Sequence, residues 1–130
     1  MIAPLDPWTH AREIAERLSH PSARLVVVLG AESWCEKCRT LRPAFDAWAI
    51  QAAPHEVRLW LDIEDHAEFI GPDLPADLPM LIAYEGARLT HAHVLKPGIE
   101  TIEHALDGAG RPAQADPGIL ARLTRENWAT

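Results

Sequence analysis

Hydrophobic residues recur along the chain with two different spacings, which predict helices in alternation with strands. At the start, Asp6 and Pro7 predict the beginning of a helix, because an aspartate N-cap accepts unpaired amide hydrogens and proline tolerates the first helical position. The apolar face of this helix carries Trp8, Ala11, Ile14, Ala15 and Leu18. Residues 24–30, RLVVVLG, are rich in β-branched side chains and predict a strand buried on both faces of a sheet.

A second amphipathic helix is predicted just after residue 35. Its apolar stripe consists of Leu41, Ala44, Phe45, Trp48, Ala49 and Ala52. Pro43 lies inside this helix, where it removes one backbone hydrogen bond and should bend the helix axis. Further strands are predicted at residues 57–63, 79–84 and 89–94, with a tight turn at Glu85 and Gly86, and further helices at residues 64–70 and from Pro97 onward.

The order of these elements predicts an α/β fold, in which helices cover both faces of a mixed sheet. We assign residues 1–107 to one domain and residues 108–130 to a connector rich in Gly, Pro and Ala followed by a C-terminal tail. The tail carries Ile119, Leu120, Leu123 and Trp128 at roughly helical spacing, and its role stays open. The whole chain has 130 residues, of which 48% are hydrophobic, and this suits a single core.

Charge and hydropathy exclude two classes of partner. The formal net charge of −7 at pH 7, without a basic cluster, opposes binding to nucleic acid or to anionic lipid. The longest apolar run, at residues 25–29, is far too short to cross a membrane, and the first residues lack the basic start of an export signal. We therefore expect a cytoplasmic monomer.

The chemistry of the chain centres on its two cysteines, Cys35 and Cys38, within the segment SWCEKCRTLRPAF. If Cys35 lies in the first turn after the buried strand, the two thiols are neighbours on the helix surface and can form a disulfide with little backbone motion. The amide hydrogens of a helix N-terminus lower the pKa of a thiol from about 8.5 toward 7. Cys35 is then the better nucleophile, and Cys38, one turn later and more buried, resolves the mixed disulfide.

The segment from Trp34 to Cys38, with the strand before it and Pro43 after it, resembles the active site of the thioredoxin family. A second segment, Leu78 and Pro79 in DLPML, resembles the cis-proline loop of that family, which faces the cysteines. The resemblance extends over residues 23–106 and implies the thioredoxin-like fold. It also implies that the Leu78 backbone and Pro79 position an extended substrate chain, and we expect Trp34 to border this chain.

Four positions depart from the pattern of that family. Leu29 occupies the place of a buried acid that serves as a proton relay, so resolution by Cys38 should be slower or should use another base. Glu36 and Lys37 replace a common Gly-Pro pair, and their opposite charges largely cancel in water. Leu95 aligns near a glycine of the substrate groove, so substrate choice should differ from that of a general thioredoxin.

Thiol–disulfide exchange with protein substrates is the predicted function, with Cys35 and Cys38 as catalytic residues and a separate reductase to restore the dithiol. This chemistry needs no organic cofactor and no metal. Two alternatives stay open. The cysteines can form half of a zinc site, with His91 and His93 as the other half. The chain can also be a thioredoxin-fold binding or chaperone-like module with little redox turnover.

Overall fold

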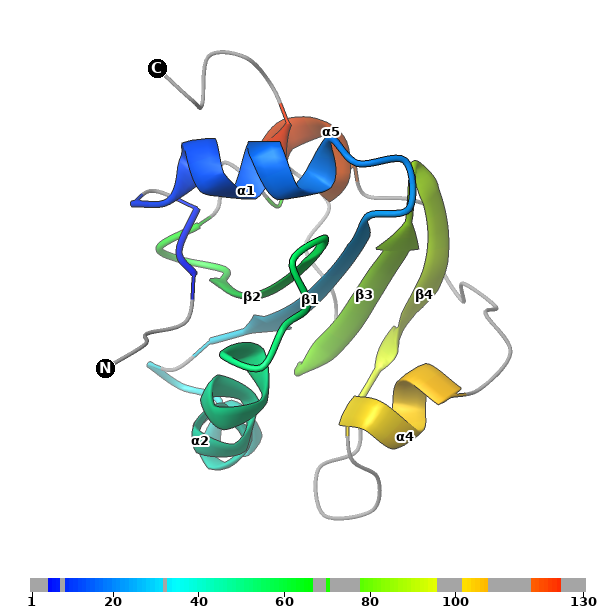
Figure 1. Ribbon diagram of the computed structural model, residues 1–130. Helices are drawn as coiled ribbons and strands as arrows, with labels where there is room; N and C mark the ends of the chain where they lie inside the picture. Colours follow the sequence, from blue (N-terminus) through cyan, green and yellow to red (C-terminus); the bar gives the residue numbers. More distant parts are fainter. Residues whose placement is uncertain are drawn as a thin grey trace.

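The computed structural model of the chain describes residues 5–7, 9–31, 33–66, 70, 78–95, 102–107 and 118–124. Four strands form one mixed sheet in the order β2-β1-β3-β4 (Figure 1). The strands are β1 (Arg24–Gly30), β2 (Glu56–Asp62), β3 (Met80–Glu85) and β4 (Arg88–Val94). β1 pairs in parallel with β2 and antiparallel with β3, which in turn pairs antiparallel with β4. Each predicted strand is found, with its ends displaced by at most one residue.

Helices cover both faces of this sheet. They are α1 (Ala11–Leu18), α2 (Glu36–Ala49), α4 (Ile102–Asp107) and α5 (Ile119–Leu123). In Figure 1, α1 and α5 lie on one side of the sheet, and α2 and α4 lie on the other. The predicted α/β architecture is therefore confirmed. None of the described helices is long and apolar enough to cross a membrane.

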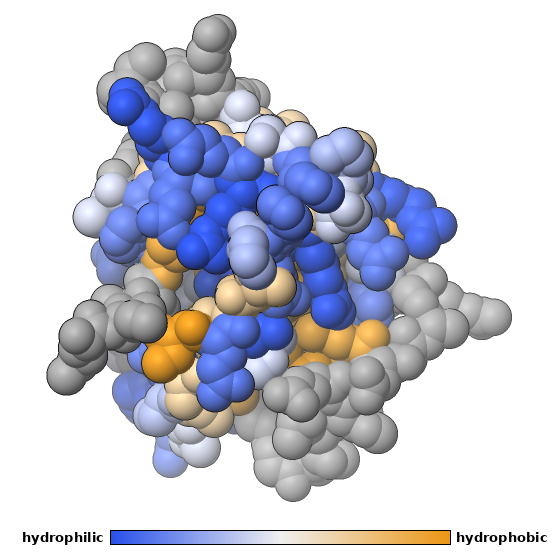
Figure 2. Space-filling model, in the orientation of Figure 1, coloured by the Kyte–Doolittle hydropathy of each residue, from blue (hydrophilic) through white to orange (hydrophobic). Residues whose placement is uncertain are grey.

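The core centres on β1, which has a neighbouring strand on each side and helices above and below. Val26, Val27 and Val28 have no exposed surface, as expected for a β-branched run in a central strand. The turn from β3 to β4 contains Gly86, whose φ of 57° lies in the left-handed region that glycine adopts without strain. In the orientation of Figure 1, hydrophilic residues cover most of the described surface and hydrophobic areas are small and separate (Figure 2).

The first helix begins later than the sequence predicts. Its N-cap is His10, not Asp6, and α1 begins at Ala11. Asp6 instead closes a turn with His10: its carbonyl accepts the His10 amide hydrogen at 2.7 Å, and its own amide hydrogen is donated to Nδ1 of His10 at 2.9 Å. The ring of His10 therefore takes part in the turn before the helix. Trp8 lies outside the described residues.

Part of the predicted tail belongs to the packed core. Ile119 and Leu123 of α5 are almost completely buried, and α5 packs against α1. Arg122 donates from Nη1 to the carbonyl of Ile70 at 3.1 Å, which fixes α5 to the segment after β2. Residues 108–117 and 125–130, including Trp128, lie outside the described residues.

Two other predicted helices are described only in part. In the helix predicted at residues 64–70, residues 64–66 form turns and Ile70 is helical. Residues 67–69 and 71–77 lie outside the described residues. The helix predicted from Pro97 is present as α4, and residues 96–101 before it lie outside the described residues.

Candidate active site at the start of α2

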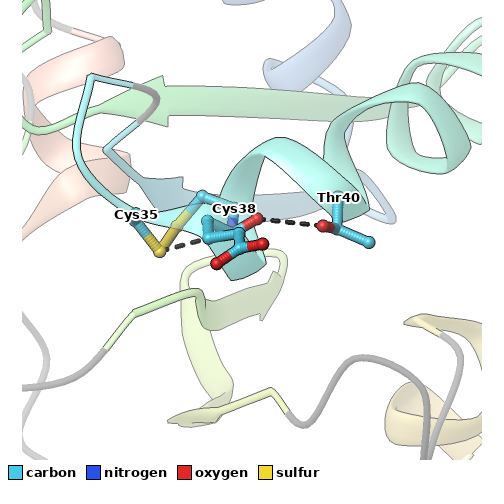
Figure 3. Close-up of a disulfide and its surroundings, with 4 residues drawn as sticks. Cys35, Cys38 and Thr40 are labelled. Carbon is cyan, nitrogen blue, oxygen red and sulfur yellow. Dashed lines mark hydrogen bonds between the residues drawn. A yellow bond between two sulfur atoms is a disulfide. The ribbon is translucent and has the colours of Figure 1, made fainter.

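Cys35 is the N-cap of α2, at the point where the chain leaves β1 and enters the helix. Its Sγ accepts the amide hydrogen of Cys38 at 3.2 Å, so the sulfur occupies the place of an N-cap oxygen (Figure 3). The backbone before it is also fixed, because the carbonyl of Ala31 accepts the amide hydrogens of Cys35 at 2.8 Å and of Trp34 at 3.3 Å. The sulfur of Cys35 therefore lies against the amide hydrogens of the first helical turn.

Cys35 and Cys38 are joined by a disulfide, and their Cα atoms are 5.2 Å apart. This separation lies within the range that disulfides ordinarily span, so the N-cap and third positions of the helix suit the bond. The exposures differ in the predicted direction: Cys35 is 7% exposed and Cys38 is completely buried. An incoming sulfur atom therefore reaches Cys35 more easily than Cys38.

The exposed side of the motif carries an aromatic side chain and a polar contact. Trp34 is 62% exposed, although it is next to a buried cysteine. The hydroxyl of Ser33 donates to the carboxylate of Glu64, which follows β2. Within the first turns of α2, the Thr40 hydroxyl donates to the Glu36 carbonyl at 3.0 Å (Figure 3). The sequence offers no sign of the contact between Ser33 and Glu64, because no local pattern reveals a partner 31 residues away.

Leu78 and Pro79 reach the same edge of the sheet as the cysteines. They directly precede β3, whose first residue, Met80, is paired with Leu29 near the end of β1. The peptide bond between Leu78 and Pro79 is cis. The Pro79 carbonyl accepts the amide hydrogen of Leu95 at 2.8 Å, so Leu95, which is itself buried, is held beside this loop.

The resemblance implies a buried acid at position 29. This residue is a leucine, and its surroundings are apolar as well. Leu29 is 1% exposed and is paired with Leu61 and Met80 on the two neighbouring strands. Asp62, a buried acid at the same edge, accepts the amide hydrogen of Glu64 at 2.9 Å and so stabilises the turn after β2. The dithiol is thus embedded in an apolar cluster, and Leu29 itself offers no proton acceptor.

The two histidines considered for a metal site lie apart from the motif. His91 and His93 are on β4, and β3 separates that strand from β1. Their ring centroids are 6.0 Å apart, and Nδ1 of His91 lies 3.0 Å from the Thr90 hydroxyl. Within the part of the chain that the structure describes, no group of three or more metal-ligating side chains is placed to hold an ion.

A hollow of about 430 Å³ lies at the opposite end of the sheet, between α1, α5 and the turn from β3 to β4. Its apolar lining includes Ala15, Leu18, Pro21, Ala87 and Leu120. The seven residues of β1 separate it from the cysteines, a distance of roughly 20 Å at the usual rise of a strand. The hollow therefore takes no part in chemistry at the sulfurs.

Comparison with known proteins identifies the fold. No protein-family model and no curated protein sequence matches the chain. Among solved structures, it is similar to a mutant thioredoxin from Halobacterium salinarum NRC-1, with a TM-score of 0.50 and 16% sequence identity over 69% of this chain and 74% of that one. Thioredoxin f from spinach chloroplast, in its short form, gives a TM-score of 0.42 and 16% identity over 56% of this chain and 64% of that one. The chain has the thioredoxin fold, with a CxxC pair at the start of α2.

Proposed function

We propose that the protein is a thiol–disulfide oxidoreductase that reduces or exchanges disulfides in protein substrates. The observation that carries the proposal is the capping contact, in which the Cys38 amide hydrogen is donated to Sγ of Cys35. In the reduced protein, the same amide hydrogen and the dipole of α2 stabilise a thiolate on Cys35. A thiolate at a helix N-cap, with a second and more buried thiol one turn later, is the arrangement that disulfide exchange requires.

The reaction proceeds in two displacements. The Cys35 thiolate attacks one sulfur of the substrate disulfide, forms a mixed disulfide and releases the first substrate thiolate, which takes a proton from water. Cys38 then loses its proton and attacks Sγ of Cys35, which forms the Cys35–Cys38 bond and releases the second substrate thiolate. Two electrons have passed from the dithiol to the substrate. A reductase must return two electrons before the next cycle.

Substrate binding is assigned to Trp34, Leu78 and Pro79. Trp34 offers an exposed aromatic surface next to Cys35, and aromatic residues of this kind often anchor protein partners. The backbone N–H and C=O of Leu78 form no hydrogen bond with the residues that the structure describes, and Leu78 lies on the sheet edge that carries the cysteines. Both groups are thus available to an extended substrate chain that adds to this edge.

Resolution by Cys38 is the slower displacement in this proposal. The Cys38 side chain has no exposed surface, and burial in an apolar cluster disfavours its thiolate. Leu29 cannot accept the proton, so water that enters with the opened disulfide must do so. We therefore expect the mixed disulfide to persist longer than it would beside a buried acid.

The setting of the enzyme follows from this chemistry. We propose a cytoplasmic monomer whose partners are a protein disulfide and a reductase, because a reducing compartment keeps a catalytic pair available as a dithiol. The net charge of −7 opposes nucleic acid as a partner.

Disulfide reduction with insulin as substrate tests the proposal. The reduced protein, with dithiothreitol as the electron source, should accelerate insulin reduction above the rate with dithiothreitol alone. Cys35→Ser should abolish the acceleration. Reduced Cys38→Ser, freed of dithiothreitol before insulin is added, should accumulate a mixed disulfide that mass spectrometry detects. If the wild-type protein forms no reversible Cys35–Cys38 bond, the proposal is wrong.

A binding module with little turnover is the second candidate. It is favoured by one observation, the apolar environment of Leu29, which slows the resolving step. A pure binding module would retain its partners after both cysteines are replaced by serine, whereas an exchange enzyme would lose covalent capture of them.

A further inference from the structure

Trp60 of β2 lies directly beside the strand end from which the cysteine turn departs. Its indole occupies the space next to Gly30, the last residue of β1: a β-carbon added at Gly30 would lie 2.8 Å from Cε2 of Trp60 and closer still to Cζ2. Trp60 is only 3% exposed, so the ring has little room to retreat. The absence of a side chain at Gly30 is therefore what permits this contact.

The same indole also contacts the helix that follows the cysteines. The Phe45 ring meets it edge-on, with centroids 5.5 Å apart, and the Arg42 guanidinium lies over it, 5.0 Å from its centroid. Arg42 is paired with Asp46 at 2.8 Å, so its charge is largely neutralised at this place. Trp60 thus separates the end of β1 from the body of α2, and it does so mainly through its shape.

These two contacts lie on either side of the hydrogen bonds that hold Cys35. On the strand side, Gly30 is bonded to Ala31, whose carbonyl accepts the Cys35 amide hydrogen. On the helix side, the first turn of α2 supplies the Cys38 amide hydrogen to Sγ of Cys35. A small displacement of either side changes the alignment of the N–H and the sulfur, and hydrogen bonds weaken steeply when they are misaligned.

We propose that Trp60 is a positioning residue for Cys35, because its indole sets the separation between the end of β1 and the body of α2, whose first turn holds the sulfur. The inference rests on the proposed role of Cys35 as the attacking thiolate. Trp60 acts without touching the sulfur or the substrate. By holding this separation, Trp60 keeps the Cys38 amide hydrogen aligned with Sγ of Cys35. The aligned hydrogen bond from the first turn of α2 then stabilises the Cys35 thiolate.

A compensating pair of substitutions tests this inference. Gly30→Ala forces the indole to move, and Trp60→Phe removes the part of the ring that faces Gly30. In each single variant the rate of alkylation of Cys35 by iodoacetamide at pH 7, measured on the reduced protein, should fall about threefold to tenfold, and the pH profile should move upward. In the double variant the added methyl group fills the space left by the smaller ring, so the rate should return to within about twofold of wild type.

Trp48→Phe is the matched control, since Trp48 is an aromatic residue at the other end of α2. It should leave the Cys35 pH profile unchanged. The inference is overturned if folded single variants have the same profile as Trp48→Phe, or if the losses in the double variant simply add. If Gly30→Ala does not fold, the comparison of Trp60→Phe with Trp48→Phe decides.

Insulin reduction by the wild-type protein is recorded in parallel, so that the two proposals fail separately. A wild-type protein that does not reduce insulin contradicts the proposed function, while the alkylation profiles still show whether Trp60 positions Cys35. An active wild-type protein with unchanged profiles in the variants contradicts the role of Trp60 alone.

Discussion

The two ends of α2 differ in the chemistry of the side chains that surround them. At the far end, the Arg58 guanidinium lies 3.9 Å from the centroid of Trp48 and donates to the Trp48 carbonyl at 2.6 Å. It also pairs with Glu56 at 2.8 Å, and both charged side chains are largely buried. At the first turn, Cys35 and Cys38 instead lie in an apolar cluster, and Sγ of Cys35 accepts its hydrogen bond from a backbone amide.

This difference indicates that the far end of α2 fixes the helix in the fold and that the first turn sets the chemistry of the thiols. At the far end, the largely buried Glu56 carboxylate is paired with Arg58, and the contacts of Arg58 with Trp48 fix α2 against β2. At the cysteine end, a fixed charge would stabilise one redox state strongly, whereas a backbone amide and the helix dipole act moderately. The chemistry of the thiols thus depends on backbone geometry, and the fold depends on side-chain pairing elsewhere.

Leu29→Asp should have the largest effect, because it places a charged side chain beside the apolar cysteine end of α2. We expect a loss of about 4 kcal/mol or more in the free energy of unfolding at pH 7, because a large apolar side chain is lost and a carboxylate is buried. Burial raises the pKa of this carboxyl group above its unfolded value, so the loss should be smaller at pH 4, where the group is neutral in the folded state and about half protonated in the unfolded one. Urea unfolding at the two pH values measures this.

Leu29→Asn is its matched control, since asparagine has a similar shape and does not titrate. Its stability loss should not depend on pH over this range. In the folded fraction, Leu29→Asp should also shorten the lifetime of the mixed disulfide about tenfold, because the carboxylate accepts the Cys38 proton. An equal lifetime in the two variants would show that Leu29 is not the reason for slow resolution.

Arg58→Leu breaks the matched charges at the far end. Glu56 would lose Arg58 and keep the ion pair with Arg24, at 3.5 Å, and the hydrogen bond from the Ala53 amide, at 3.4 Å. The contact over Trp48 would also be lost. We expect the free energy of unfolding to fall by about 2–4 kcal/mol. Insulin reduction at a temperature where the variant is folded should stay within about twofold of wild type. A larger change in activity would mean that the far end of α2 also tunes the thiols.

Trp34→Ala tests the exposed side of the cysteine end. Because the side chain is 62% exposed, the free energy of unfolding should change by less than about 0.5 kcal/mol. The kcat/KM for insulin should fall about fivefold, which corresponds to one lost contact with a protein substrate. Reduction of a small aromatic disulfide should be unaffected, and an equal loss with both substrates would place Trp34 in the chemistry itself.

Ser33→Ala is expected to have the smallest effect. It removes the hydrogen bond to Glu64, which is exposed, and should lower the free energy of unfolding by about 0.5 kcal/mol. Glu64→Gln keeps an acceptor for the serine and removes the negative charge. If Glu64→Gln speeds alkylation of Cys35 and Ser33→Ala does not, the charge of Glu64 acts on the thiolate independently of the hydrogen bond.

The sequence predicts the strands and the cysteine turn because these depend on local patterns. A β-branched run such as residues 24–30 is specific for a buried strand, and the spacing of Cys35 and Cys38 places them on one helical turn. Cys38, one turn further into α2, is also more buried than Cys35, as expected. These features need no knowledge of distant residues.

Features that depend on distant contacts could not be predicted in the same way. The start of α1 is displaced because Asp6 bonds to His10, and its carboxylate also lies 3.1 Å from Nε2 of His66, far along the chain. The sequence alone does not explain why residue 30 is a glycine. The structure does, because the Trp60 ring occupies the space that a side chain at this position would need. Whether a short apolar segment such as Ile119–Leu123 joins the core depends likewise on the free surface that α1 offers.

The relative reactivity of the two thiols tests the proposed chemistry most directly. In the reduced protein, brief alkylation at pH 7 followed by peptide mass spectrometry should show Cys35 modified at least about tenfold faster than Cys38, because only Cys35 combines access with the helix N-terminus. Equal rates, or faster modification of Cys38, would contradict the assignment of Cys35 as the attacking thiolate.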